Sequence, residues 1–170
     1  MNNTKDVLFT TELFKNETDA EKAYQDALDA GYTPKDINVL MSEDSRNKYY
    51  GSVLVKEGSK ASEGAGVGGA TGAAIGGIVA AIAAIGTSLL IPGLGLVIAG
   101  PLAAGLAGAG AGGLAGGIVG ALIGWGIPED QAKKFEAGIK SGGIVLGVNE
   151  TPDHPRLGSK WEKYRSPERM

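Results

Sequence analysis

The feature that most constrains the fold of this chain is a run of 65 residues, from Gly64 to Pro128, without a charged side chain. The run holds 21 of the 29 glycines of the 170-residue chain, and alanine, isoleucine, leucine and valine supply most of its other residues. The nearest ionised side chains are Glu63 and Glu129. Globular domains carry about 25% charged residues, so this run is not a globular domain of ordinary composition.

Small residues recur every four positions in both halves of the glycine-rich run. Because four residues are just over one helical turn, each row forms a nearly straight groove along one face of a helix. Such grooves let a second backbone approach closely, as in the small-xxx-small packing of membrane helices. The predicted helix-packing residues are Gly64, Gly68, Gly72, Gly76, Ala80, Ala84, Ala104, Gly108, Gly112, Gly116, Gly120 and Gly124.

Two prolines divide the run into halves of helical length. Pro92 and Pro101 each remove a helical hydrogen-bond donor, and the glycines beside them favour a turn. We therefore predict a glycine-zipper hairpin over 64–126, with α-helices at about 66–90 and 102–126 joined by an apolar loop. Each helix would be ~37 Å long, which is enough to cross a ~30 Å hydrocarbon core.

The environment of this hairpin has three interpretations: a membrane, the interior of a multimer, or disorder. Disorder is considered because glycine costs ~1 kcal/mol relative to alanine in a helix. Flexible glycine linkers are rich in polar residues, however, whereas this run carries branched aliphatic residues at helical spacing. In the membrane interpretation, Lys56 and Lys60 before the run and Lys133 and Lys134 after it place both termini in the cytoplasm, by the positive-inside rule. The expected location is then the inner (cell) membrane, and the alternative is the cytoplasm.

The segments that flank the run predict a small α+β domain. Thr18 and Glu21 have the spacing of a capping box, Gly31 is suited to the C′ position of the helix that follows, and Pro128 begins a second helix. The predicted strands are 6–14, 37–41 and 144–148, with Gly51–Lys56 as a possible further strand, and the predicted helices are 18–30 and 129–140. This order is that of a ferredoxin-like split β-α-β-(β)-α-β domain interrupted by the hairpin.

The predicted organisation follows from these elements. Residues 1–60 form the first part of the α/β domain and residues 127–150 the second part. The two parts must pair across the hairpin, because neither has enough apolar residues to fold alone. Residues 151–170 contain three prolines and mixed charge, and we expect a flexible tail there.

Composition and motifs argue against several classes of function. A net charge of −3 does not suggest a nucleic-acid surface, and the absence of cysteine excludes disulfides and thiolate metal sites. Two stretches beginning at Gly64 and Gly108 match G-x-G-x-x-G, but neither is followed by a second strand and an acidic residue. We therefore predict no nucleotide cofactor.

Catalytic groups are equally scarce. His154 is the only histidine and lies in the expected tail, without partners for a metal. Ser42 and Ser45 are not part of a nucleophile elbow. The sequence therefore predicts no catalytic residues, no cofactor, no metal and no small-molecule substrate, and we do not expect an enzyme.

Four segments carry a resemblance to a known family. They are Asp36–Ser42, Ile91–Gly95, Gly126–Asp130 and Gly142–Val145, and their order is more specific than any one of them. Over about 7–149 the chain resembles bacterial general stress proteins of the heat-induced or low-temperature-induced type. The resemblance implies a short α/β domain with a glycine-zipper segment and implies no catalytic residues.

Together these features predict a non-enzymatic stress-response protein. Its hairpin would associate with the lipid bilayer, mediate helix packing and drive homo-oligomerisation. One alternative is a soluble self-assembling protein with its hairpins buried in a multimer, and another is a small-ligand-binding α/β domain. Trp125, at the end of the second helix, would lie at a bilayer interface or pack on the α/β domain.

Overall fold

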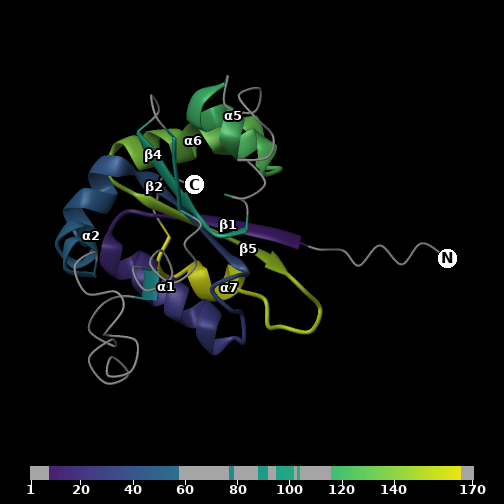
Figure 1. Cartoon of the computed structure of the whole chain (residues 1–170). Helices are drawn as coiled ribbons and strands as arrows, with labels where there is room; N and C mark the ends of the chain where they lie inside the picture. The colour runs from purple at the N-terminus through teal and green to yellow at the C-terminus, as the bar shows by residue number, and fades with distance from the viewer. Residues whose placement is uncertain are drawn as a thin grey trace.

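A computed structural model describes residues 8–57, 77–78, 88–91, 95–101, 103 and 116–165, and for Leu8, 51–57 and 88–91 it describes the backbone alone. These residues form a five-stranded antiparallel sheet with helices on both faces (Figure 1). The predicted α+β class is therefore confirmed.

The sheet joins residues from before, within and after the glycine-rich run. Its strand order is β1-β5-β2-β4-β3, and the register places Thr11 opposite Gly147 and Leu40 opposite Val145. The strands are β1 (Leu8–Phe14), β2 (Ile37–Ser42), β3 (Ser88–Ile91), β4 (Leu96–Ala99) and β5 (Ile144–Glu150). The central strands β5 and β2 thus pair the two flanking parts of the chain directly.

Helices cover both faces because the central strands are apolar on both sides. Ile144 and Leu146 of β5 lie in one core with α1 (Glu17–Asp29) and α7 (Gly158–Trp161). Val145 between them lies in a second core with α5 (Gly117–Gly124) and α6 (Glu129–Lys140). The sheet is consequently the middle layer of three (Figure 1).

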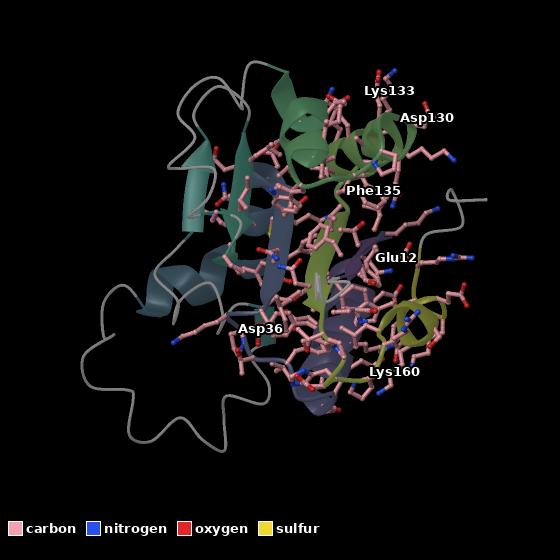
Figure 2. All side chains as sticks on the ribbon, turned by 90° about the vertical axis from the view of Figure 1, so that its right-hand side faces the viewer. Glu12, Asp36, Asp130, Lys133, Phe135 and Lys160 are labelled. Carbon is pink, nitrogen blue, oxygen red and sulfur yellow. The ribbon has the colours of Figure 1, made fainter. Side chains whose placement is uncertain are left out.

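Helix α6 illustrates how sequence periodicity sets this packing. Its buried residues Ala132, Phe135 and Ile139 recur at helical spacing and contact the sheet. Lys133 and Asp130 point away from the sheet, and Figure 2 shows them on the outer side of the helix from Phe135. The predicted helix, with its start at Pro128–Asp130 and its end at about Lys140, therefore agrees closely with α6.

The ferredoxin-like arrangement is not confirmed. That arrangement keeps its helices on one face of the sheet, whereas α1 and α6 lie on opposite faces. Both β1-α1-β2 and β4-α5-α6-β5 connect parallel strands across one intervening strand. Two right-handed connections of this layout would place their helices on the same face, so one of the two departs from the right-handed rule.

The possible strand Gly51–Lys56 is wrong, because these residues belong to α2 (Glu43–Glu57). The Oγ of Ser42 accepts a hydrogen bond from the Ser45 N–H at 3.0 Å, which caps the start of the helix. Glu43 and Asp44 add negative charge to the first turn, where the helix dipole favours it. The helix then continues through Gly51–Lys56, the apolar segment for which the sequence predicts a possible strand.

The predicted apolar loop between the two long helices is also wrong. It contains β4, and the residues just before it form β3, which pairs with β4 as a β-hairpin. All four residues of β4 are buried, as in a strand covered on both faces. Gly100 follows at a φ of 107°, where any side chain would collide with the backbone of Ile37 and Asn38.

The two predicted transmembrane helices are not present as such. The first predicted helix covers about 66–90, but its last residues, 88–90, belong to strand β3. Among its other described residues, Gly77 and Ile78 are helical. The second is interrupted at Gly117, whose φ of 66° is left-handed, and α5 then runs for only eight residues. Among the described residues no helix is long and apolar enough to cross a membrane, so the membrane-anchored interpretation is wrong.

The expected flexibility after Thr151 is not found as far as Arg165. The Trp161 side chain is fully buried, its Nε1–H donates to the Ala23 carbonyl at 2.9 Å, and its ring packs edge-on against Phe14. The Leu157 N–H donates to the Glu150 carboxylate at 2.8 Å. These contacts fix the tail against β1 and α1.

Candidate functional site

Three of the predicted helix-packing residues lie in the described part of the chain. Gly116 precedes α5, and Gly120 and Gly124 lie within it. The others lie outside the described residues, namely Gly64, Gly68, Gly72, Gly76, Ala80, Ala84, Ala104, Gly108 and Gly112. The candidate site is therefore built on α5.

Helix α5 has two different sides. Ile118, Ala121 and Leu122 are buried against α6 and the sheet. The opposite side carries Gly116, Gly120, Ile123 and Gly124, which we call the outer face of α5. Gly116 and Gly124 are exposed, and Ile123 keeps 45% of its surface in water. The small-residue row therefore lies directly opposite the core.

The outer face is open at its C-terminal end. A Cβ placed on Gly124 would meet no heavy atom within 4 Å, whereas one on Gly116 would lie 2.9 Å from the Gly120 Cα. Gly124 therefore leaves the helix backbone accessible to anything that packs there, and Gly120 is partly buried. Because glycine has no side chain, a neighbouring backbone can approach more closely here than at other helix surfaces.

The chemistry of this face is restricted to packing. Between Gly116 and Gly124 no side chain carries a hydrogen-bonding group or a charge. A helix that is apolar on all sides is normally buried on all sides. The outer face of α5 thus has the composition of an interior surface but the exposure of an exterior one.

Trp125 belongs to the core beneath this helix. Its ring packs edge-on against Phe9, with the ring centroids 6.3 Å apart, and little of its surface is exposed. Its Nε1–H has no hydrogen-bond partner among the described residues. Of the two positions considered for Trp125, the one on the α/β domain is the one observed.

A second part of the glycine-rich run contacts the domain at α1. The Ile78 side chain is fully buried beside Tyr24. Gly77 lies so close to the Tyr24 ring that a Cβ there would be 2.9 Å from it. The run is therefore not a separate appendage, because Ile78 completes the core on this face.

Glu21 holds this contact through both carboxylate oxygens. Oε2 accepts a hydrogen bond from the Ile78 N–H at 3.2 Å, and Oε1 accepts one from the Tyr50 hydroxyl at 3.2 Å. The predicted capping box assigns Glu21 to the start of α1, but the cap is Asn16, whose side chain accepts from the Asp19 N–H at 2.9 Å. Glu21 is thus left to join α1, α2 and the glycine-rich run.

Burial dominates the electrostatics around Glu21. It raises the pKa of the Glu21 carboxyl, and the hydrogen bonds from Ile78 and Tyr50 only partly oppose this shift. Burial also raises the pKa of the Tyr50 and Tyr24 hydroxyls, and the nearby charge of Glu21 raises both further. Glu21 therefore carries its charge at a cost, next to two tyrosines that stay protonated.

The residues considered for chemistry in the sequence are not brought together. The ring of His154 stacks on Tyr32 at 4.6 Å, and its Nδ1 lies 2.9 Å from the Thr151 hydroxyl. Within the described residues no group of three or more histidine or acidic side chains could hold a metal ion. The two G-x-G-x-x-G stretches lie outside the described residues.

Comparison with known proteins adds no relative. The chain matches no family model, no curated protein and no solved structure.

Proposed function

We propose that the protein self-associates through the outer face of α5 and acts as a non-enzymatic assembly protein. One observation carries this proposal: α5 is apolar on every side, yet Gly116, Ile123 and Gly124 are exposed and Gly120 is only partly buried. Burial of apolar surface stabilises by roughly 25 cal/mol per Å², so an uncovered apolar helix favours association.

The occupant that fits best is the α5 helix of a second copy. A row of glycines is complemented by another surface that can approach closely, and the same row in a second copy provides one. Across a twofold axis the two rows would face each other and bury Ile123 from both copies. A charged partner is disfavoured, because the outer face offers it neither a countercharge nor a hydrogen-bonding side chain.

This proposal keeps part of the expectation drawn from the sequence. The alternative in which glycine-rich segments pack inside a multimer agrees with the position of the row on α5. The order of segments that resembles the general stress proteins supports a role in the stress response, and homo-oligomerisation is the proposed partner relationship.

The test places a large side chain on the outer face without disturbing the monomer. Gly124→Leu extends into open space and replaces glycine within a helix, so the free chain should fold at least as well. In an assembly the same side chain would overpack the contact by ~1–3 kcal/mol, and the dimer dissociation constant should rise roughly 5- to 150-fold. Sedimentation velocity over a concentration series measures this change.

Gly158→Leu is the matched control. Gly158 also has no atom within 4 Å of a Cβ, but it lies in α7, on the other side of the sheet. This variant should assemble like the unmodified protein. A monomeric unmodified protein, or a folded Gly124→Leu variant that assembles as the control does, would overturn the proposal.

A further inference from the structure

A cavity on the opposite side of α5 from its outer face is lined by groups that can bind a ligand. It has a volume of about 380 Å³ and lies between the start of α2, the turn before β4 and the end of α6, with Ile118 of α5 at its floor. Sites for small molecules have volumes of about 300–1,000 Å³ and combine apolar walls with a few polar groups. We call it the serine–lysine cavity, after Ser42, Ser45, Lys48 and Lys140.

The Ser42 and Ser45 hydroxyls have two hydrogens between them, and the hydrogen bond that joins them uses only one. The Ser42 and Ser45 hydroxyl oxygens lie 2.8 Å apart, and Ser42 Oγ also accepts from the Ser45 N–H at 3.0 Å. A hydroxyl has one hydrogen and two lone pairs. Whichever hydroxyl donates to the other, the second hydrogen of the pair has no acceptor among the described residues. Ser45 lines the cavity and keeps 3% of its surface exposed.

The charged groups of the cavity are mainly positive. Lys48, Lys140 and Asp44 are the charged residues of the lining, and the Lys48 ammonium lies over the Tyr49 ring, 5.2 Å from its centroid. Lys140 lies 2.8 Å from Glu136 on its own helix, but both side chains are partly exposed, and such pairs are worth only ~0–1 kcal/mol. Lys140 can therefore turn to another anion at little cost.

The remaining wall is apolar. Leu96, Ile118 and Ile139 are the apolar residues of the lining, and of these Ile118 keeps 6% of its surface exposed while the other two are fully buried. Ser141 is also part of the lining, but its hydroxyl already donates to the Gly138 carbonyl at 2.9 Å. The cavity thus combines a donor, two cations and an apolar floor.

We propose that the serine–lysine cavity binds a small phosphate monoester with an apolar body. The phosphate oxygens would accept the spare hydroxyl hydrogen of the Ser42–Ser45 pair and lie beside the ammonium groups of Lys48 and Lys140. The apolar body would rest against Ile118, the apolar lining residue that keeps some exposed surface. Binding here requires neither self-association nor the outer face of α5.

Phenyl phosphate is the probe, followed by the amide NMR signals of Ser45 and Gly142 in the full chain. We expect saturable shifts with a dissociation constant of about 1 mM or tighter. Lys48→Gln and Lys140→Gln should each weaken binding roughly fivefold, as expected for partly exposed charges. Both lysines are exposed, so neither change should disturb folding.

Lys133→Gln is the matched control, because Lys133 pairs with Glu129 on α6 at 2.7 Å just as Lys140 pairs with Glu136. It does not line the cavity, and it should bind phenyl phosphate like the unmodified protein. Phenol alone should leave the signals unchanged. The proposal is overturned by the absence of saturable shifts, by equal affinity in the three lysine variants, or by equal shifts with phenol.

Discussion

Helices α1 and α5 cover opposite faces of the same sheet, but only α1 has the polar exposed side that is typical of a surface helix. The inner side of α1 is formed by Ala20, Ala23, Tyr24 and Ala27, and its exposed side is polar. The exposed side of α5 consists of glycines and Ile123. The polar exposed side of α1 is well solvated by water, whereas the apolar exposed side of α5 is not.

The two faces also differ in how the chain closes them. Helix α1 is covered by α7, through Trp161, and by Ile78 of the glycine-rich run. Both closures come from segments far away in sequence. The difference suggests that this face is completed within one chain, while the α5 face is completed by association.

The largest test of this comparison is Trp161→Ala, which removes the closure over α1. Loss of a fully buried tryptophan should lower the free energy of unfolding by ~3–5 kcal/mol, and it leaves the Ala23 carbonyl without its 2.9 Å hydrogen bond. Urea unfolding measures the change. Lys160→Ala, an exposed neighbour, should stay within ~0.5 kcal/mol of the unmodified protein. If the two variants unfold alike, the tail is not part of this core.

The sequence identifies the elements whose periodicity is local. Strands β1, β2 and β5 and helices α1 and α6 lie close to their predicted positions, because alternation or helical spacing of apolar residues is visible within each segment. The strand pair β3–β4 is missed. A short apolar run such as Leu96–Ala99 fits a buried strand as well as a helix, and only its partner β2 decides.

The candidate sites show the same limit. The four-residue period places Gly120 and Gly124 on one side of α5, because that alignment is a property of the helix itself, and Gly116 directly precedes the helix. The serine–lysine cavity is only partly visible in the sequence, since Ser42, Ser45 and Lys48 come from around the start of α2, whereas Lys140 comes from the end of α6. The role of Trp161 depends likewise on Ala23, which is 138 residues away.

A second test compares two glycines at the end of α5. Neither Gly124 nor Gly126 has an atom within 4 Å of a Cβ, but Gly126 has a φ of 81° and Gly124 is not left-handed. Gly124→Ala should raise the free energy of unfolding by up to ~1 kcal/mol. Gly126→Ala should lower it by ~1–2 kcal/mol, because a side chain is strained at this φ. Urea unfolding in dilute solution measures both, and a destabilising Gly124→Ala would mean that the outer face is already covered within the monomer.

The smallest expected effect is the pH dependence due to Glu21, which links α1 to the glycine-rich run. Since burial raises its pKa above the usual 4.5, the folded state binds the proton more tightly than the unfolded state. The stability that Glu21 contributes is therefore fully present below pH 4.5 and is lost as the pH rises through the raised pKa. Glu21→Gln keeps an acceptor for Ile78 but does not titrate.

Urea unfolding of both proteins between about pH 4 and pH 7 isolates this contribution. The free energy of unfolding of the unmodified protein, minus that of Glu21→Gln, should fall as the pH rises and then level off. Glu129→Gln gives a control of opposite sign, because Lys133 lowers the pKa of Glu129, so the corresponding difference should rise with pH. A flat or rising difference for Glu21→Gln would show that Glu21 stays in water, and the contact between α1 and Ile78 would then not be what closes this face.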